Sequence, residues 1–120
     1  MPYQHNPTLS CAMLRGTATM PQLSGRLRLC QRGDSIFVRV CLSGLPGKEK
    51  PSIFPLRILV PQTGTLLLPC IPVSESGTVF LTYQTGGFTL REVLNHTAEV
   101  INAKNEIFAR GEIREIEGTP

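Results

Sequence analysis

Hydrophobic and polar residues alternate along most of this chain in short runs, and turn-forming residues separate the runs. Alternation with a period of two is typical of a β-strand that buries one face. Glycine and proline between the runs are typical of tight connections. The pattern predicts strands at 10–17, 24–30, 35–42, 52–60, 65–68, 78–83, 97–102 and 107–116. Seven or eight short strands at this spacing predict an all-β fold, either a Greek-key β-sandwich or a flattened barrel.

The clearest hairpin is formed by the second and third of these runs. Residues 31–34 (QRGD) between them have the composition of a tight turn, in which glycine adopts a positive φ. In the simplest register Arg28 lies directly opposite Arg39, and like charges so placed are unfavourable by roughly a few tenths of a kcal/mol. Two interpretations remain open. Either the side chains extend separately into water, or Arg26, Arg28 and Arg39 form a face that binds an anion or an acidic partner.

Individual residues mark where the strands end or bend. The glycine pair at 86–87 ends one strand, and Thr89 then begins a short helical segment. Thr89 can serve as the N-cap of that segment, with Glu92 as its capping-box partner. Pro55 has no N–H to donate, so its strand is expected either at a sheet edge or kinked at that residue.

The composition is that of one globular domain covering residues 1–120, with a polar lead-in at 1–8 and a short tail at 117–120. Hydrophobic residues make up 41% and charged residues 18% of the chain. These are ordinary values for a folded protein and exclude a disordered one. The net charge is +3, but the basic residues are spread along the chain, so nucleic-acid binding is not expected.

The four cysteines, Cys11, Cys30, Cys41 and Cys70, form no C-x-x-C pair. The polar, proline-containing start of the chain is unlike a signal peptide, and no hydrophobic run is long enough to span a membrane. We therefore expect a cytoplasmic protein without membrane contact, in which the cysteines are small buried thiols.

Few residues are available for catalysis or metal binding. The chain has two histidines and one aspartate, and Asp34 lies in a predicted turn, so no Ser-His-Asp arrangement is expected. A stable copper or zinc site needs about four converging imidazole, thiolate or carboxylate donors. The donors left for an atypical site are His5, His96 and Cys70, and their spacing does not predict that they converge.

Three parts of the chain, taken in order, resemble the copper/zinc superoxide dismutases. Residues 31–34 (QRGD), the strand after them and residues 42–47 (LSGLPG) resemble that family's second hairpin. The region from Leu68-Pro69 through Gly77 and Phe88-Thr89 to EVIN at 99–102 is similar to bacterial members, in particular a Firmicute-like branch. Residues 109–113 (ARGEI) resemble the family's closing strand, A-C-G-V-I. The resemblance implies a Greek-key β-sandwich or flattened barrel with shortened loops.

The residues that hold metal in this family are replaced here. Its F-H-I-H motif supplies two copper ligands and reads FPLR in this chain, with Pro55 and Arg57 at the ligand positions. Asn102 stands where the family has a further copper-binding histidine. Arg110 replaces the cysteine of the family's disulfide, and residues 59–68, which correspond to the zinc-binding loop, contain no His, Asp or Glu.

The resemblance therefore implies a superoxide dismutase-like domain whose metal sites are lost. Such a domain would be a non-enzymatic structural or protein-interaction module without a cofactor. Its protein partner is not identified by the sequence. A homodimer through exposed strand faces is one form, and an acidic partner bound to Arg26, Arg28 and Arg39 is another. The alternative is a superoxide dismutase-type metal-binding enzyme with an atypical or residual site.

Overall fold

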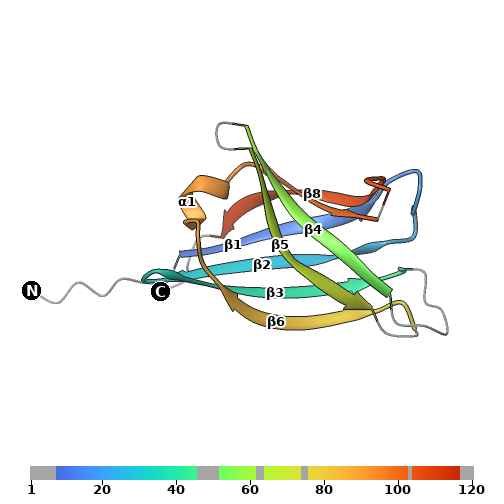
Figure 1. The fold of residues 1–120 in the computed structure, drawn as a ribbon, viewed down its shortest axis with the longest axis horizontal. Helices are drawn as coiled ribbons and strands as arrows, with labels where there is room; N and C mark the ends of the chain where they lie inside the picture. Colours follow the sequence, from blue (N-terminus) through green and yellow to red (C-terminus); the bar gives the residue numbers. More distant parts are fainter. Residues whose placement is uncertain (1–7, 46–51, 62–63, 74–75, 103, 117–120) are drawn as a thin grey trace, which may run out of the picture.

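The computed structural model describes residues 8–45, 52–61, 64–73, 76–102 and 104–116, and these contain eight strands and one short helix (Figure 1). Of the lead-in expected at 1–8, residues 1–7 lie outside the described residues, as does the tail at 117–120, whereas Thr8 already belongs to the first strand. The elements are β1 (Thr8–Gly16), β2 (Ser24–Arg32), β3 (Ser35–Ser43), β4 (Ser52–Val60), β5 (Gly64–Val73), β6 (Val79–Thr85), α1 (Leu90–Val93), β7 (Thr97–Ile101) and β8 (Ile107–Ile116). The all-β prediction is confirmed. In the part of the chain that the structure describes, no helix is long and apolar enough to cross a membrane.

All eight strands belong to one antiparallel sheet with the order β5-β4-β7-β8-β1-β2-β3-β6. The connections after β3, β5 and β6 join strands that are not hydrogen-bonded neighbours, and such crossovers are typical of Greek-key folds. The sheet curls strongly into a half-barrel, so that β4 and β5 cross in front of β1, β2 and β3 (Figure 1). Of the two predicted architectures, the structure resembles the flattened barrel more than a sandwich of two separate sheets, and it is open between the edge strands β5 and β6.

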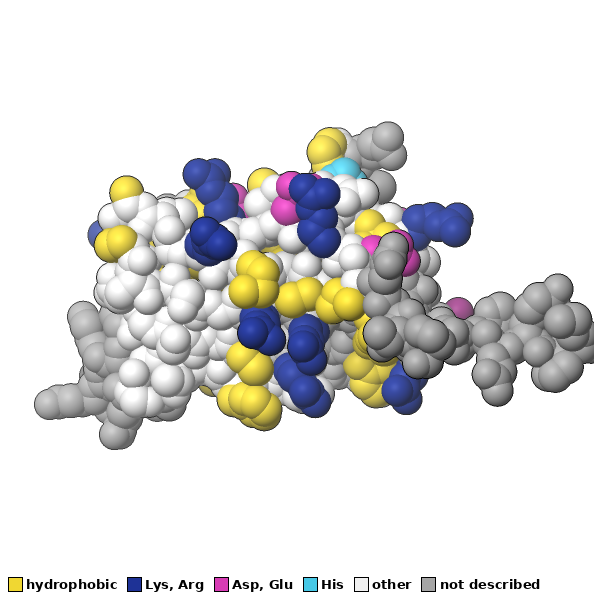
Figure 2. Space-filling model, turned by 180° about the vertical axis from the view of Figure 1, so that it is seen from behind, with side chains coloured by type: hydrophobic (Ala, Val, Ile, Leu, Met, Phe, Trp, Pro, Cys, Tyr) yellow, Lys and Arg dark blue, Asp and Glu magenta, His cyan; other side chains and the backbone are white. Residues whose placement is uncertain are grey.

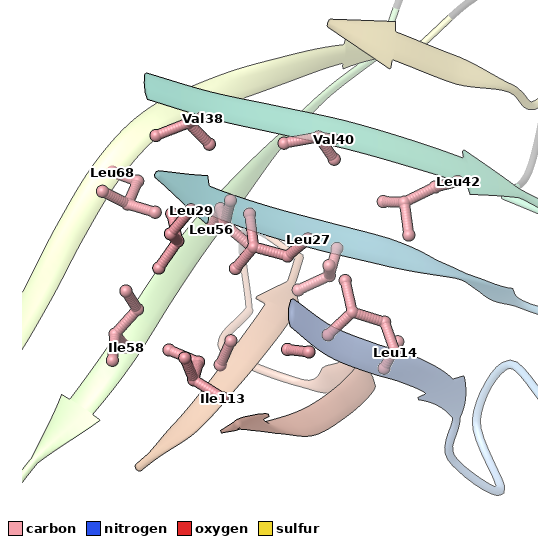
Figure 3. Packing of buried hydrophobic residues seen from close by; sticks show 14 of the residues in the cluster. Leu14, Leu27, Leu29, Val38, Val40, Leu42, Leu56, Ile58, Leu68 and Ile113 are labelled. Carbon is pink, nitrogen blue, oxygen red and sulfur yellow. The ribbon is translucent and has the colours of Figure 1, made fainter. Parts of the chain in front are cut away.

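The inner face of the curled sheet encloses one hydrophobic core. Alternate residues of each strand point inward, as in β2, where Leu27 and Leu29 are buried and Arg26 and Arg28 are exposed. Figure 3 shows side chains from β1, β2 and β3 facing side chains from β4 and β5 across this core. The labelled residues are Leu14, Leu27, Leu29, Val38, Val40, Leu42, Leu56, Ile58, Leu68 and Ile113. The predicted period of two therefore fixes which side chains remain on the outer surface.

The β2–β3 hairpin has the predicted register. Gly33 lies in its turn with φ of 59°, a conformation that glycine adopts without steric cost. Arg28 pairs with Arg39 directly across the ladder, as expected. The short helix α1 is capped as predicted, because the Thr89 hydroxyl accepts from the backbone N–H of Glu92 and the Glu92 carboxylate accepts from that of Thr89.

The structure corrects one prediction, the length of the fifth strand, and decides between the two alternatives given for Pro55. The sequence placed the fifth strand at 65–68, but β5 continues to Val73, because Pro72 and Val73 still pair with the first residues of β4. Pro55 does not mark a sheet edge, since β4 lies between β5 and β7. Instead the register shifts between Phe54 and Leu56, so the strand is kinked at the residue that cannot donate.

Candidate functional site

Arg26, Arg28 and Arg39 lie together on the outer surface of the sheet. The register places Arg28 opposite Arg39 on one side and opposite Cys11 of β1 on the other. Arg39 in turn lies opposite Thr82 of β6. We call the outer surface formed by β8, β1, β2, β3 and β6 around these three arginines the arginine face. The structure brings together Arg26, Arg28 and Arg39, which the hairpin pattern predicted to share one face. It also places β1, β6 and β8 beside that hairpin, which the sequence alone did not predict.

Exposed hydrophobic side chains surround these arginines. Five of the six large exposed hydrophobic residues in the described part of the chain lie on the arginine face: Leu9, Met13, Phe37, Phe80 and Ile116. Phe80 is the most exposed of them, at 79%. Figure 2 shows basic and hydrophobic side chains side by side over the middle of the molecule seen from behind. Such a mixture is unusual for a surface that only contacts water.

Two hollows lie on either side of the Arg28–Arg39 pair, and both arginines line both of them. The first has a volume of about 440 Å³, and Leu9, Cys30, Phe37 and Ile116 are among the residues that line it. Arg32 also lines it, with its guanidinium carbon 5.7 Å from the centroid of the Phe37 ring. The second hollow is smaller, about 280 Å³. The other residues that line it are Gly25, Arg26, Cys41 and Phe80.

No carboxylate among the described residues pairs with the central arginines. The ion pairs found there join Arg57 to Glu99 and Arg114 to Glu112. Glu112 lies on β8, beyond β1, and its carboxylate contacts Arg114 at 2.9 Å. The positive charge of Arg26, Arg28 and Arg39 is therefore not neutralised by any residue that the structure describes, and the like-charged pair on adjacent strands favours an external anion.

The three positions that the resemblance identified as former metal ligands have structural roles here. Arg57 on β4 donates from Nε to Oε1 of Glu99 on β7 at 2.7 Å. Asn102 organises the β7–β8 connection: its Oδ1 accepts from the backbone N–H groups of Lys104 and Glu106, and its Nδ2 donates to the Glu106 carboxylate. Pro55 lies at the irregularity in β4. None of these three side chains offers an imidazole, thiolate or carboxylate to a metal ion.

The remaining candidate donors are not gathered into a site that the structure describes. His96 lies between α1 and β7, where its backbone N–H donates to Val93 and its carbonyl accepts from Ile113. His5 and the side chain of Cys70 are outside the described part. Within the described residues no group of three or more His, Cys, Asp or Glu side chains could hold a metal ion.

Three cysteines and one tyrosine among the described residues also carry reactive groups. Cys11, Cys30 and Cys41 are free and half-buried, and the register places all three on the arginine face rather than in the core, where the sequence placed them. Tyr83 on β6 has a buried hydroxyl with no hydrogen-bond partner among the described residues. Burial raises the pKa of Tyr83 to about 12, so its phenol is neutral at physiological pH.

In comparisons with known proteins, no protein-family model matches this chain, and no curated protein matches its sequence at a significant level.

Proposed function

We propose that this domain is a protein-interaction module that binds an acidic partner through the arginine face. The observation that carries the proposal is the composition of that face: Arg26, Arg28 and Arg39 lie near the exposed Phe37 and Phe80, and the central part holds no lysine and no acidic residue that the structure describes. Arginine, methionine and aromatic residues are enriched at the centres of protein–protein interfaces, whereas lysine and acidic residues are depleted. A few residues carry most of the binding energy in such interfaces, and arginine is enriched among them.

Charge favours a different protein over a second copy of this chain. Two arginine faces brought together would oppose guanidinium groups on both sides, and the whole chain already carries a net charge of +3. Like charges across an interface cost affinity and slow association. The aliphatic side chains of Leu9, Met13 and Ile116 on the same face favour a protein over single-stranded nucleic acid, because bases stack on aromatic rings rather than on aliphatic groups.

We further propose that the domain is a superoxide dismutase-like fold that has lost its metal sites. The antiparallel Greek-key sheet supports this proposal, as do the residues at the former ligand positions, where Arg57 forms an ion pair and Asn102 stabilises a turn. The alternative is a metal-binding enzyme with an atypical site built from His96, Cys70 or His5. That site would need at least three donors to converge in space.

Metal content separates these two proposals. We expect protein purified from cells grown with added copper and zinc to hold far less than one metal ion per chain after dialysis, because Pro55, Arg57 and Asn102 are not copper or zinc ligands. Elemental analysis measures this directly. For the same reason we expect the melting temperature to be unaffected by EDTA. A stoichiometric metal that survives dialysis, or a melting temperature that falls with chelator, would support the enzyme instead.

Site-specific photo-crosslinking tests the interaction proposal. A photoreactive phenylalanine analogue at Phe80 is expected to capture a partner protein in cells that naturally express this chain. The same analogue at Leu67 is the matched control, because Leu67 is also strongly exposed, at 74%, but lies on β5 outside the arginine face. The double substitution Arg28→Glu/Arg39→Glu should lower the adduct yield at position 80 by at least about tenfold, since charge reversal repels an acidic partner.

The captured segment supplies a second readout. Mass spectrometry of the adduct is expected to identify a region of the partner that is rich in Asp and Glu. Equal capture at positions 67 and 80, or capture that charge reversal leaves unchanged, would contradict the proposal. Unchanged melting curves of the variants would exclude misfolding as the reason for lost capture.

A further inference from the structure

The Arg28–Arg39 pair is placed between two hollows that follow the direction of β2 and β3. Along β2, Cys30 lines the first hollow, Arg28 lies between, and Arg26 lines the second. Along β3, the corresponding residues are Phe37, Arg39 and Cys41. The outer surface therefore presents an apolar hollow, a pair of cations and a second hollow in a line.

The spacing along this line is set by strand geometry. Side chains on one face of a strand are two residues apart, which corresponds to about 6.8 Å. The first hollow, the arginine pair and the second hollow thus lie at successive steps of about 6.8 Å. A second extended chain that runs along β2 and β3 would present its own side chains at the same interval, because residues i, i+2 and i+4 share one face of an extended segment.

We infer that the arginine face binds an extended segment of a partner protein with the pattern hydrophobic–x–acidic–x–hydrophobic. This inference rests on the proposed function, and it specifies the partner's chemistry. The acidic side chain lies between Arg28 and Arg39, the hydrophobic residue on one side enters the hollow beside Leu9 and Phe37, and the one on the other side contacts Phe80.

The contact between the partner's acidic side chain and both Arg28 and Arg39 gives a reason for two arginines at directly opposed positions. Each guanidinium can donate two parallel hydrogen bonds to a carboxylate, and such charge-assisted pairs are stronger than neutral hydrogen bonds. One carboxylate shared by Arg28 and Arg39 also removes the repulsion between them. No residue that the structure describes supplies that carboxylate, and in the inferred complex the partner supplies it.

The first hollow explains why the partner needs hydrophobic residues as well as charge. Leu9, Ile116 and Phe37 are each partly exposed there, and a side chain that enters removes their apolar surface from water. Arg32, whose guanidinium carbon lies 5.7 Å from the centroid of the Phe37 ring, adds a third cation to the lining of this hollow. Charge alone would favour any polyanion, whereas the hollows select for apolar residues at fixed positions.

Two peptides of identical composition test the pattern. The first is acetylated and amidated Thr-Leu-Thr-Glu-Thr-Phe-Thr, in which Leu, Glu and Phe share one face. The second is Thr-Leu-Glu-Thr-Thr-Phe-Thr, in which the glutamate points to the opposite face when the chain is extended. Each is titrated into the full ¹⁵N-labelled chain, and amide shifts are followed by NMR. We expect the first peptide to bind at least about tenfold more tightly than the second, with shifts confined to β1, β2, β3, β6 and β8.

A matched pair of arginine substitutions provides the control. Arg28→Gln is expected to weaken binding of the first peptide by at least about tenfold, or about 1.4 kcal/mol. Arg91→Gln removes the same charge from an exposed arginine on α1 and is expected to leave the affinity unchanged. Equal loss in both variants would mean that only net charge matters and would overturn the inference.

The other outcomes are equally decisive. Equal affinity for the two peptides, or no saturable shift at millimolar peptide, would overturn the inferred pattern. If the photo-crosslink at position 80 nevertheless captured an acidic protein, the proposed function would stand and only the pattern would fall. A dimer of this chain that dissociates in Arg28→Gln would also overturn the inference, because it would assign the face to a second copy.

Discussion

Leu27→Ala is expected to lower the free energy of unfolding by about 3 kcal/mol. Leu27 is 0% exposed and lies on β2, in the middle of the sheet, where it pairs with Ala12 and Val40 on the two neighbouring strands. Figure 3 shows it near the centre of the labelled core residues. Removing three carbon atoms there loses their transfer energy and leaves a cavity that a sheet hydrogen-bonded on both sides of β2 cannot close.

Urea denaturation followed by circular dichroism measures this loss. Leu67→Ala is the matched control, because it makes the same chemical change at an exposed position of β5 and should alter stability by less than about 0.5 kcal/mol. A loss below about 1 kcal/mol for Leu27→Ala would mean that the two halves of the curled sheet do not enclose a tightly packed core.

The same variant separates folding from binding. Leu27 and Arg28 are neighbours on β2 but point to opposite faces of the sheet. A core cavity should therefore weaken the fold without changing the outer surface, so folded Leu27→Ala should bind the first peptide as the natural chain does. Successive residues of each strand point alternately to the core and to the arginine face, so a substitution can alter one of these without altering the other.

The sequence was sufficient to predict strands and faces wherever alternation is strict. In β2 and β3 the predicted inward and outward residues are confirmed, and the turn at Gly33 fixes the register that opposes Arg28 to Arg39. The prediction failed in β5, because Pro69 and Pro72 argue against a strand when the chain is considered alone. Pairing with β4 outweighs that local preference, and this is a tertiary effect.

Only half of the candidate site could be predicted from the sequence. The three arginines come from one hairpin and are local in the chain. Phe80 and Ile116 come from β6 and β8, which lie beside β3 and β1 although they are distant in sequence. Periodicity shows which face a residue occupies but not which strands are neighbours, so the hydrophobic residues that β1, β6 and β8 add beside Phe37 could not be foreseen. The placement of Cys11, Cys30 and Cys41 on the outer surface followed from the same alternation and was missed because cysteine is usually buried.

Arg57→Leu is expected to lower the free energy of unfolding by about 3 kcal/mol through a different mechanism. The Glu99 side chain is only 3% exposed, and Arg57, at 21%, is its one ion-pair partner among the described residues. Removing the guanidinium leaves a buried carboxylate without a cation, and such an uncompensated charge is strongly destabilising. The loss would come from desolvation of Glu99 rather than from a cavity.

Arg110→Leu is the matched control for this prediction. Arg110 lies directly opposite Glu99 on β8, on the other side from Arg57, but it forms no ion pair with Glu99 among the contacts that the structure describes. It should therefore cost less than about 1 kcal/mol in the same denaturation experiment. Equal losses for the two variants would contradict the assignment of Arg57 as the partner of Glu99.

The double variant Arg57→Leu/Glu99→Leu completes the cycle. We expect it to recover most of the stability lost in Arg57→Leu, because two hydrophobic residues can replace a buried ion pair with little net cost. Recovery would show that Arg57 is retained to neutralise Glu99. This bears on the function, because Arg57 stands where the dismutase resemblance has a copper-binding histidine. Position 57 would then serve the fold, whereas Arg26, Arg28 and Arg39 form no ion pair among the described residues and remain for the proposed partner.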